Sequence, residues 1–264
     1  MIHSISVRVE AAPCETVTAR PRPSLRPYVV GYGGFRTGTA EPPSRRVLPL
    51  SLATLIVDFA GPGLVTGPRS TPLVCESGWR HGIAIGLTSA GAAALLGVPM
   101  RELAGAEVPL DALIGGRARR LADRVAEGPD WAARFAVLDG ELARLLPARA
   151  DPTPDGAVSR AWWRIQESAG RLRIEELAGE LGVPRRRLEA GFQRRIGLPP
   201  KTVARIARFQ HAALLLSGPA AAPDLAAACG YADQPHLTRD VRAMSGLTPL
   251  RLRAFLQYDG RPAG

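Results

Sequence analysis

Residues 224–249 read DLAAACGYADQPHLTRDVRAMSGLTP, and residues 176–200 read ELAGELGVPRRRLEAGFQRRIGLPP. The two segments align as copies of one unit. Their leucine, alanine and first glycine positions recur 48 residues apart. After a one-residue insertion, the later leucine, glycine and proline positions recur 49 residues apart. This internal repeat predicts two copies of one supersecondary structure that differ only in the length of a turn.

The first copy has the pattern of two short helices joined by a tight turn. Ile174, Leu177, Ala178 and Leu181 are spaced as the apolar stripe of a helix. Gly182 is expected to end this helix, because glycine adopts the left-handed conformation after a helix without steric cost. A second helix then buries the side chains of Leu188, Phe192 and Ile196. The order helix, glycine-containing turn, helix predicts a helix-turn-helix motif.

The second copy carries clearer signals for the start of its second helix. Asp233 is a good N-cap, and Pro235 falls in the first turn, where no amide donor is needed. The apolar side chains expected to face inward in this helix are Leu237, Val241 and Met244. Tyr231 is expected to pack in the turn together with Leu237. The second copy is therefore also predicted to be a helix-turn-helix motif.

The side chains left on the outward faces are those suited to contact DNA. Arginine and glutamine form paired hydrogen bonds with guanine and adenine edges in the major groove, which a recognition helix enters near its start. The candidate DNA-binding residues are Arg185, Arg186, Arg187, Glu189 and Gln193 in the first copy, and Gln234, His236, Arg239 and Arg242 in the second. A solvated helix face explains one such copy equally well. Two copies within a basic segment favour DNA binding.

Charge and spacing support this interpretation. Residues 157–264 hold 17 basic and 9 acidic side chains, so they carry +8 of the net charge of +10. A basic segment of this kind is expected to meet a polyanion. Between the two copies, residues 200–217 read as one long helix, which would rise about 27 Å. That length is close to one DNA turn of about 34 Å, so one chain can reach two successive major-groove segments.

The C-terminal third resembles the AraC/XylS transcriptional regulators. The segments that carry the resemblance are IEELAGELGVPRRRLEAGFQRRIGLPPKTVARIARFQHAALLL and LAAACGYADQPHLTRDVRAMSGLTPLRLR, which look like that family's two motifs. The resemblance implies sequence-specific DNA binding through two recognition helices. It places base-contacting positions on Arg186, Glu189 and Ala190 in the first helix, and on Gln234, Pro235, His236 and Arg239 in the second.

This chain departs from the family pattern mainly in the first motif. Ala190 cannot hydrogen-bond a base, and Glu189 repels phosphate while it is able to accept from cytosine. Pro184 replaces the usual hydroxyl cap of the first recognition helix, and Val241 replaces a usual phenylalanine in the second. We therefore expect the second helix to supply most of the base recognition and the arginines of the first to hold phosphates.

The N-terminal part is expected to be a small β-rich unit followed by a helical hairpin. Apolar runs at 47–59 and 83–87 predict strands, and Ser89 is a plausible N-cap for the helix that follows. Helical patterns at 110–127 and 130–146 predict a hairpin, whose apolar face is either core or a dimer seam. In the second of these patterns Phe135, Leu138, Leu142, Leu145 and Leu146 fall on one face.

This part resembles the cupin-like β-barrel sensor domains of some AraC-type regulators, in stretches such as RRVLPLSLATLIVDFAG and AAALLGVPMREL. The resulting fold class is α+β with two domains: a β-rich, cupin-like domain with a helical hairpin, and an all-α double helix-turn-helix domain. The predicted boundaries are 1–147 for the first domain, 148–158 for a linker and 159–258 for the DNA-binding domain. A proline-rich loop is expected at 38–46, and residues 77–82 (SGWRHG) either line a pocket or pack in a turn.

The sequence predicts a cytoplasmic transcriptional regulator and not an enzyme. Hydrolase and phosphate-loop motifs are absent, and no metal or other cofactor is expected. The expected partners are the major groove of double-stranded DNA, RNA polymerase, a small-molecule effector and a second copy bound through the first domain, with no membrane contact. Two alternatives remain: a DNA-repair alkyl acceptor fused to a regulator, and a first domain that dimerises without sensing. The alkyl acceptor needs clustered cysteines, whereas Cys14, Cys75 and Cys229 are far apart.

Overall fold

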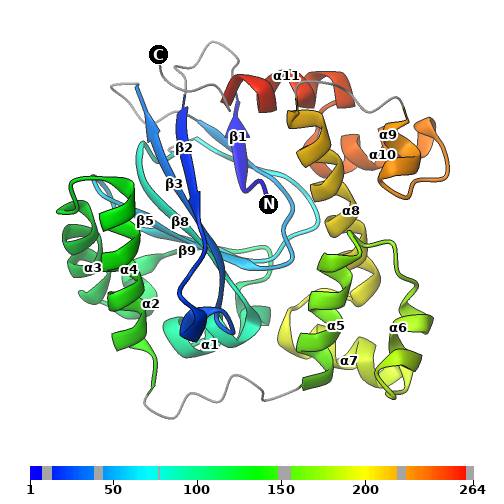
Figure 1. Ribbon diagram of the computed structural model, residues 1–264, viewed down its shortest axis with the longest axis horizontal. Coiled ribbons are helices and arrows are strands. Elements are labelled where there is room, and N and C mark those ends of the chain that lie inside the picture. Colours follow the sequence, from blue (N-terminus) through cyan, green and yellow to red (C-terminus); the bar gives the residue numbers. More distant parts are fainter. Residues whose placement is uncertain (8–13, 39–43, 77, 148–155, 219–223, 260–264) are drawn as a thin grey trace.

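The N-terminal part of the computed structural model forms two antiparallel β-sheets, and helices follow to the C-terminus (Figure 1). The structure describes residues 1–7, 14–38, 44–76, 78–147, 156–218 and 224–259. The strands are β1 Ser4–Ser6, β2 Cys14–Ala19, β3 Val29–Thr37, β4 Arg45–Val47, β5 Ala53–Asp58, β6 Leu64–Thr66, β7 Leu73–Cys75, β8 His81–Leu87 and β9 Glu107–Pro109. The predicted α+β fold class, β-rich and then helical, is confirmed.

One sheet has six strands in the order β2-β3-β8-β5-β6-β9, and the other has three in the order β1-β4-β7. Backbone pairing between the described strands closes neither sheet into a barrel. The central strand β5 is buried on both faces. Leu55 and Val57 belong to the main core under the helices, whereas Ile56 packs with Val47 and Cys75 of the small sheet. Burial on both faces explains why β5 is a continuous apolar run and not an alternating one.

Helices of the first domain cover one face of the six-stranded sheet. They are η1 Pro23–Leu25, α1 Ser89–Leu96, η2 Met100–Leu103, α2 Leu110–Ile114, α3 Arg117–Ala126 and α4 Trp131–Leu145. The buried side chains of α4 include Phe135, Leu138 and Leu142, as the periodicity predicts. Leu145 and Leu146 are only partly buried against the same core.

Several predicted boundaries in the first domain are wrong. The single helix predicted at 110–127 is two helices, because Gly115 has φ 60° and ψ −146°, a conformation that a helix cannot contain. The N-cap of α1 is Thr88 and not Ser89, since Thr88 Oγ1 accepts from the Gly91 amide at 3.0 Å. The strand predicted at 47–59 is interrupted, with β4 ending at Val47 and β5 starting at Ala53. The loop predicted at 38–46 includes Arg45 and Arg46 of β4, and its residues 39–43 lie outside the described chain.

The C-terminal half is all helical. Its elements are α5 Gly156–Glu167, α6 Ile174–Glu180, α7 Arg185–Arg195, α8 Pro200–Ser217, α9 Leu225–Ala228, α10 Gln234–Ser245 and α11 Pro249–Asp259. Figure 1 shows α8 running between the α5–α7 group and the α9–α11 group. Residues 148–155 of the predicted linker lie outside the described chain, and α5 starts at Gly156, inside that predicted linker.

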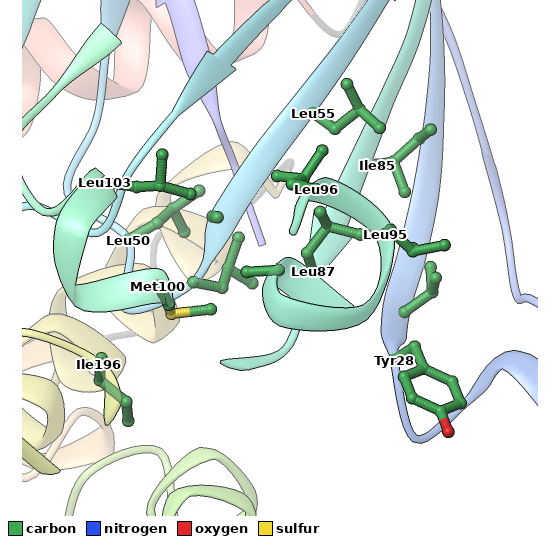
Figure 2. Close-up of a cluster of buried hydrophobic side chains, with 14 of the residues drawn as sticks. Tyr28, Leu50, Leu55, Ile85, Leu87, Leu95, Leu96, Met100, Leu103 and Ile196 are labelled. Carbon is green, nitrogen blue, oxygen red and sulfur yellow. The ribbon is translucent and has the colours of Figure 1, made fainter. Parts of the chain in front are cut away.

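Both halves contribute to shared buried surfaces. Figure 2 shows Ile196, at the end of α7, near Met100 of η2, which in turn lies beside Leu50 and Leu87 of the first domain. Trp162 of α5 donates its indole N–H to the backbone oxygen of Ser51 at 3.2 Å. The helical half is therefore held against the β-rich half by apolar contact and by buried hydrogen bonds.

Gln210 of α8 makes three hydrogen bonds between the halves. Its side-chain amide is buried and donates to the backbone oxygens of Ile2 and Pro49, each at 3.0 Å. Its Oε1 accepts from the Ile2 amide at 2.7 Å. The middle of α8 is thereby fixed to the segment before β1 and to the segment after β4.

Candidate nucleic-acid interface and effector cavity

The first repeat folds as predicted, with α6 and α7 joined by a turn that backbone hydrogen bonds close. Ile174, Leu177 and Ala178 are buried on α6. Gly182 has φ 63°, which a side chain rarely tolerates, and the amide of Val183 returns to the oxygen of Ala178 at 3.1 Å. This bond satisfies one of the free carbonyls at the end of α6 and fixes where α7 begins.

The second repeat closes its turn with the same geometry. Gly230 has φ 73°, and the amide of Tyr231 donates to the oxygen of Ala226 at 2.9 Å, matching the bond of the first copy. Asp233 is the N-cap of α10, since its carboxylate accepts from the His236 amide at 2.7 Å. The first copy has no counterpart to this cap, because Pro184 precedes α7 without a side-chain acceptor.

The inward faces of α7 and α10 are buried, which leaves the candidate side chains on the outward faces. Buried residues of the two helices include Leu188, Phe192, Leu237, Val241 and Met244. The side chains of Arg185, Arg186, Arg187, Gln193, Gln234, Arg239 and Arg242 are exposed, and those of Glu189 and His236 are half-buried. All nine candidates therefore lie on the two helices that the repeat analysis selected.

Several candidates on α7 are engaged by neighbouring groups. Arg185 Nε lies 2.8 Å from Glu189 Oε1, and the same guanidinium pairs with Glu175 of α6. Gln193 Nε2 donates to the backbone oxygen of Gly197 at 3.3 Å, just beyond the helix end. Within the described chain, Arg186 and Arg187 have neither an ion pair nor a side-chain hydrogen bond. Those two arginines carry the available positive charge at the start of α7.

The candidates on α10 are arranged differently. His236 lies edge-on to the ring of Tyr231, with ring centroids 5.1 Å apart, so its ring packs in the turn. Arg239 Nε reaches back to the Pro235 oxygen at 3.4 Å, a long contact on the exposed face. Among the described residues, Gln234 and Arg242 have no side-chain partner. The exposed donors of α10 are therefore Gln234, Arg239 and Arg242.

An ion pair positions α10 on the linking helix α8. Arg205 Nη2 lies 2.8 Å from Asp240 Oδ1, and the Asp240 side chain is largely buried. Nearby, the guanidinium of Arg208 lies over the ring of Tyr231 at 5.6 Å from the centroid. Burial raises the pKa of Tyr231 well above its usual range, with the charge of Asp240 as a second cause, so this phenol stays neutral. These groups connect α8 to the second motif, and of them only Tyr231 was predicted from the sequence to pack there.

Residues 177–254 match a protein-family model described as a helix-turn-helix domain. The C-terminal part of this chain is an AraC-type helix-turn-helix domain. The matched residues run from α6 into α11, so the AraC-type domain includes both motifs and the whole of α8.

Two solved structures show what the chain is similar to. A transcriptional regulator with an AraC-type DNA-binding domain from Chromobacterium violaceum is 24% identical, with 40% of this chain and 96% of that chain covered and a TM-score of 0.37. ToxT from Vibrio cholerae O395 is 10% identical, with 96% of each chain covered and a TM-score of 0.46. No curated protein sequence matches the chain.

A cavity of about 770 Å³ lies in the first domain beside the AraC-type domain. Most of its wall comes from β1, β2, β3 and β8, and many of these residues are apolar or glycine. Leu214 and Ser217 of α8 and Leu256 of α11 complete the wall. A volume of this size is typical of a small-molecule site, and here the site touches both halves of the chain.

The wall also contains polar side chains, among them His3 and Arg45. His3 Nε2 is 3.0 Å from Thr66 Oγ1, and burial together with the charges of Arg45 and Arg69 lowers the pKa of His3 to about 3. The imidazole is therefore neutral at physiological pH. Arg45 lines the cavity as well and is itself buried. Trp79 belongs to the segment for which the sequence allowed either a pocket or a packing role. It packs on Phe35 and also lines the cavity.

The three cysteines are buried, with Cys14 and Cys75 in one apolar cluster and Cys229 in another. Cys75 donates its S–H to the Glu107 carboxylate, and burial followed by this bond raises its pKa to about 12. Burial also raises the pKa of Cys229, to about 11. In the parts of the chain that the structure describes, no three His, Cys, Asp or Glu side chains are grouped to hold a metal, and no helix is long and apolar enough to span a membrane.

Proposed function

We propose that this protein is a one-component transcriptional regulator that binds a specific DNA site with α7 and α10 and responds to a small molecule held in the first domain. One observation supports the DNA-binding proposal most directly. Two turns of the same closed geometry place two helices with outward-facing Arg and Gln side chains on either side of α8. The proposed domains are 1–147 and 159–258, with α5 joining the second.

In this proposal the two helices have different roles. Arg186 and Arg187 hold phosphates, so α7 contributes affinity through counterion release and little sequence preference. Gln234, Arg239 and Arg242 present exposed donors at the start and along the outward face of α10, where base edges are read. The other four candidate side chains each contact a neighbouring residue already, and in this proposal they hold the DNA-contacting groups in place. They are Arg185, Glu189, Gln193 and His236.

The decisive experiment selects bound DNA from random fragments with the full-length protein at a fixed salt concentration. The expected result is an enriched site with two recognised segments separated by about one helical turn of 10 to 10.5 base pairs. Stronger base preference is expected in the segment contacted by α10. If no sequence is enriched over the input, the proposal of specific DNA binding is wrong.

Arg239→Ala tests the role assigned to α10. The variant is expected to lose roughly 1 to 3 kcal/mol of affinity for the selected site and to accept other bases at one position. Arg120→Ala, which removes an exposed arginine from α3, is the matched control and should bind like the wild type. A uniform loss on every sequence, without relaxed preference, would instead assign Arg239 to phosphate binding.

Control by an effector rests on the cavity, because its wall joins β-strands of the first domain to α8 and α11. A compound that fills it changes the contacts that hold the AraC-type domain. Compounds that raise the Tm of the wild type are expected to change its affinity for the selected site as well. In Ala84→Phe the larger side chain occupies cavity space, so the same compounds should change neither the Tm nor the DNA affinity. If stabilising compounds never alter DNA affinity, the first domain serves dimerisation and not sensing.

A further inference from the structure

The first domain contacts both recognition helices at their C-terminal ends. Arg101 of η2 donates from Nη1 to the backbone oxygen of Arg194, the second-last residue of α7, at 3.1 Å. At the end of α10, the guanidinium of Arg46 in β4 lies against Gly246, so close that a Cβ there would be 3.0 Å from Arg46 Nη1. Two arginines of one domain thus reach two helices of the other.

The two contacts fall on equivalent positions of the repeat. Gly197 and Gly246 are 49 residues apart, the offset that relates the two copies after their turns. Both glycines follow the recognition helices with positive φ, 84° and 72°. A Cβ at Gly197 would lie 2.7 Å from Ala104 Cβ and 3.1 Å from Arg101 Cα. The first domain therefore approaches the same point of both motifs. It leaves no room for a side chain at Gly197, whereas a side chain at Gly246 would require the end of Arg46 to move by a few tenths of an ångström.

The chemistry of a helix end explains why arginine serves at these points. The last turn of an α-helix leaves backbone carbonyls without partners and carries the negative end of the helix dipole. At α7 the guanidinium of Arg101 gains a hydrogen bond and a favourable field, and at α10 the guanidinium of Arg46 gains the field alone. At α7 apolar contact adds to this, because Ile196 packs in one cluster with Met100 and Leu103 of η2 (Figure 2).

The first domain also holds the helix between the motifs. The three hydrogen bonds of Gln210 fix the middle of α8 to Ile2 and Pro49. The AraC-type domain is thereby attached to one body at α7, at α8 and at α10. Within the described chain α7 and α10 both pack on α8, and the first domain adds a second constraint on their separation.

We propose that the first domain sets the separation of the two recognition helices, with Arg101 and Arg46 as positioning residues, and so determines which spacing between the two DNA segments the chain accepts. This inference rests on the proposed function, since it assumes that α7 and α10 both enter the major groove. Each base pair added between the segments moves the second segment by about 3.4 Å and rotates it around the DNA axis. Two recognition helices held at a fixed separation cannot adjust to that displacement.

The test uses full-length protein and duplexes that carry the selected site with its central spacing lengthened or shortened by one or two base pairs. The wild type is expected to prefer one spacing by roughly tenfold over its neighbours, the cost of deforming DNA or protein to fit. Arg46→Ala/Arg101→Ala is expected to reduce this preference to roughly two- to threefold. The ratio of affinities is the readout, because loss of two positive charges also weakens binding to every duplex.

Arg117→Ala/Arg120→Ala is the matched control. It removes two exposed arginines of α3 from the same domain, away from both recognition helices, and should keep the wild-type spacing preference. Circular dichroism checks that both variants are folded. An unchanged spacing preference in Arg46→Ala/Arg101→Ala, with specific binding retained, would overturn the inference and leave the proposed function intact. Absence of any specific site for the wild type would overturn both.

Discussion

Arg185 and Arg186 are neighbours on α7 but have different electrostatic surroundings. Arg185 pairs with Glu175 and Glu189, so much of its charge is already balanced, whereas Arg186 has no such partner among the described residues. An arginine that binds a phosphate displaces counterions from the DNA only if its own charge is not already neutralised by a carboxylate. The two side chains are therefore unequal as phosphate ligands despite their adjacent positions.

We predict that Arg186→Ala weakens DNA binding more than Arg185→Ala. Arg186→Ala should lower the slope of log affinity against log salt by about one, and Arg185→Ala by clearly less, because Glu175 and Glu189 lose their partner at the same time. Titrations at several salt concentrations measure both slopes. Equal reductions in the two variants would contradict this assignment.

At this scale the sequence predicted which side chains face outward but not what they touch. Helical periodicity places Gln193 and His236 on the outer faces from their spacing alone. Their contacts, Gln193 to the Gly197 oxygen and His236 to the Tyr231 ring, depend on turn conformation and rotamers that periodicity does not encode. The Arg205–Asp240 pair was missed for a similar reason, since the partners come from different helices.

Among the elements, α10 depends on its cap. We predict that Asp233→Ala lowers the free energy of unfolding by about 0.5 to 2 kcal/mol, because the His236 amide loses its acceptor in the first turn. Asp233→Asn should stay close to the wild type, since asparagine caps about as well as aspartate. Urea unfolding of the three proteins measures the difference. Equal losses in both variants would show that the charge matters and not the cap.

Helices of the AraC-type domain were predictable because their signals are local. The predicted helix at 200–217 coincides with α8, Pro200–Ser217, which starts with a proline in its first turn. Strands of the first domain were harder to find. β3, Val29–Thr37, contains Gly31, Gly33 and Gly34, which hide any alternation of apolar and polar residues. Its pairing with β2 and β8 comes from residues distant in sequence and leaves no pattern in a short window.

For the whole molecule, Gln210 is the test of how firmly the halves are joined. We predict that Gln210→Ala lowers the free energy of unfolding by roughly 1 to 3 kcal/mol, because buried backbone groups of Ile2 and Pro49 lose their partners. The loss should be accompanied by faster amide exchange at Ile2. Gln257→Ala is the control, since Gln257 bonds only to Gly218 within the C-terminal half. A loss no greater than in the control would contradict a firm junction.

The proline-rich stretch near residue 150 predicts two units, and no sequence pattern indicates that they share a core. In the structure Val158, Trp162 and Ile165 of α5 belong to one buried cluster with Leu50 and Leu87 of the first domain. Side chains more than 60 residues apart meet there. Amphipathic patterns show that a helix face is buried but not against which partner, so this junction required the structure.

The strand β1 has a consequence for how the chain is made. Ile5 is fully buried, yet its cover includes Leu252 and Phe255 of α11, nearly 250 residues later. At typical elongation rates of about 5 to 20 residues per second, this cover leaves the ribosome roughly ten to fifty seconds after Ile5. Leu48, in the same cluster, also stays uncovered until α11 has been synthesised. The β-rich half therefore passes through synthesis with an apolar surface open to other proteins, and translation that stalls before α11 leaves that surface open.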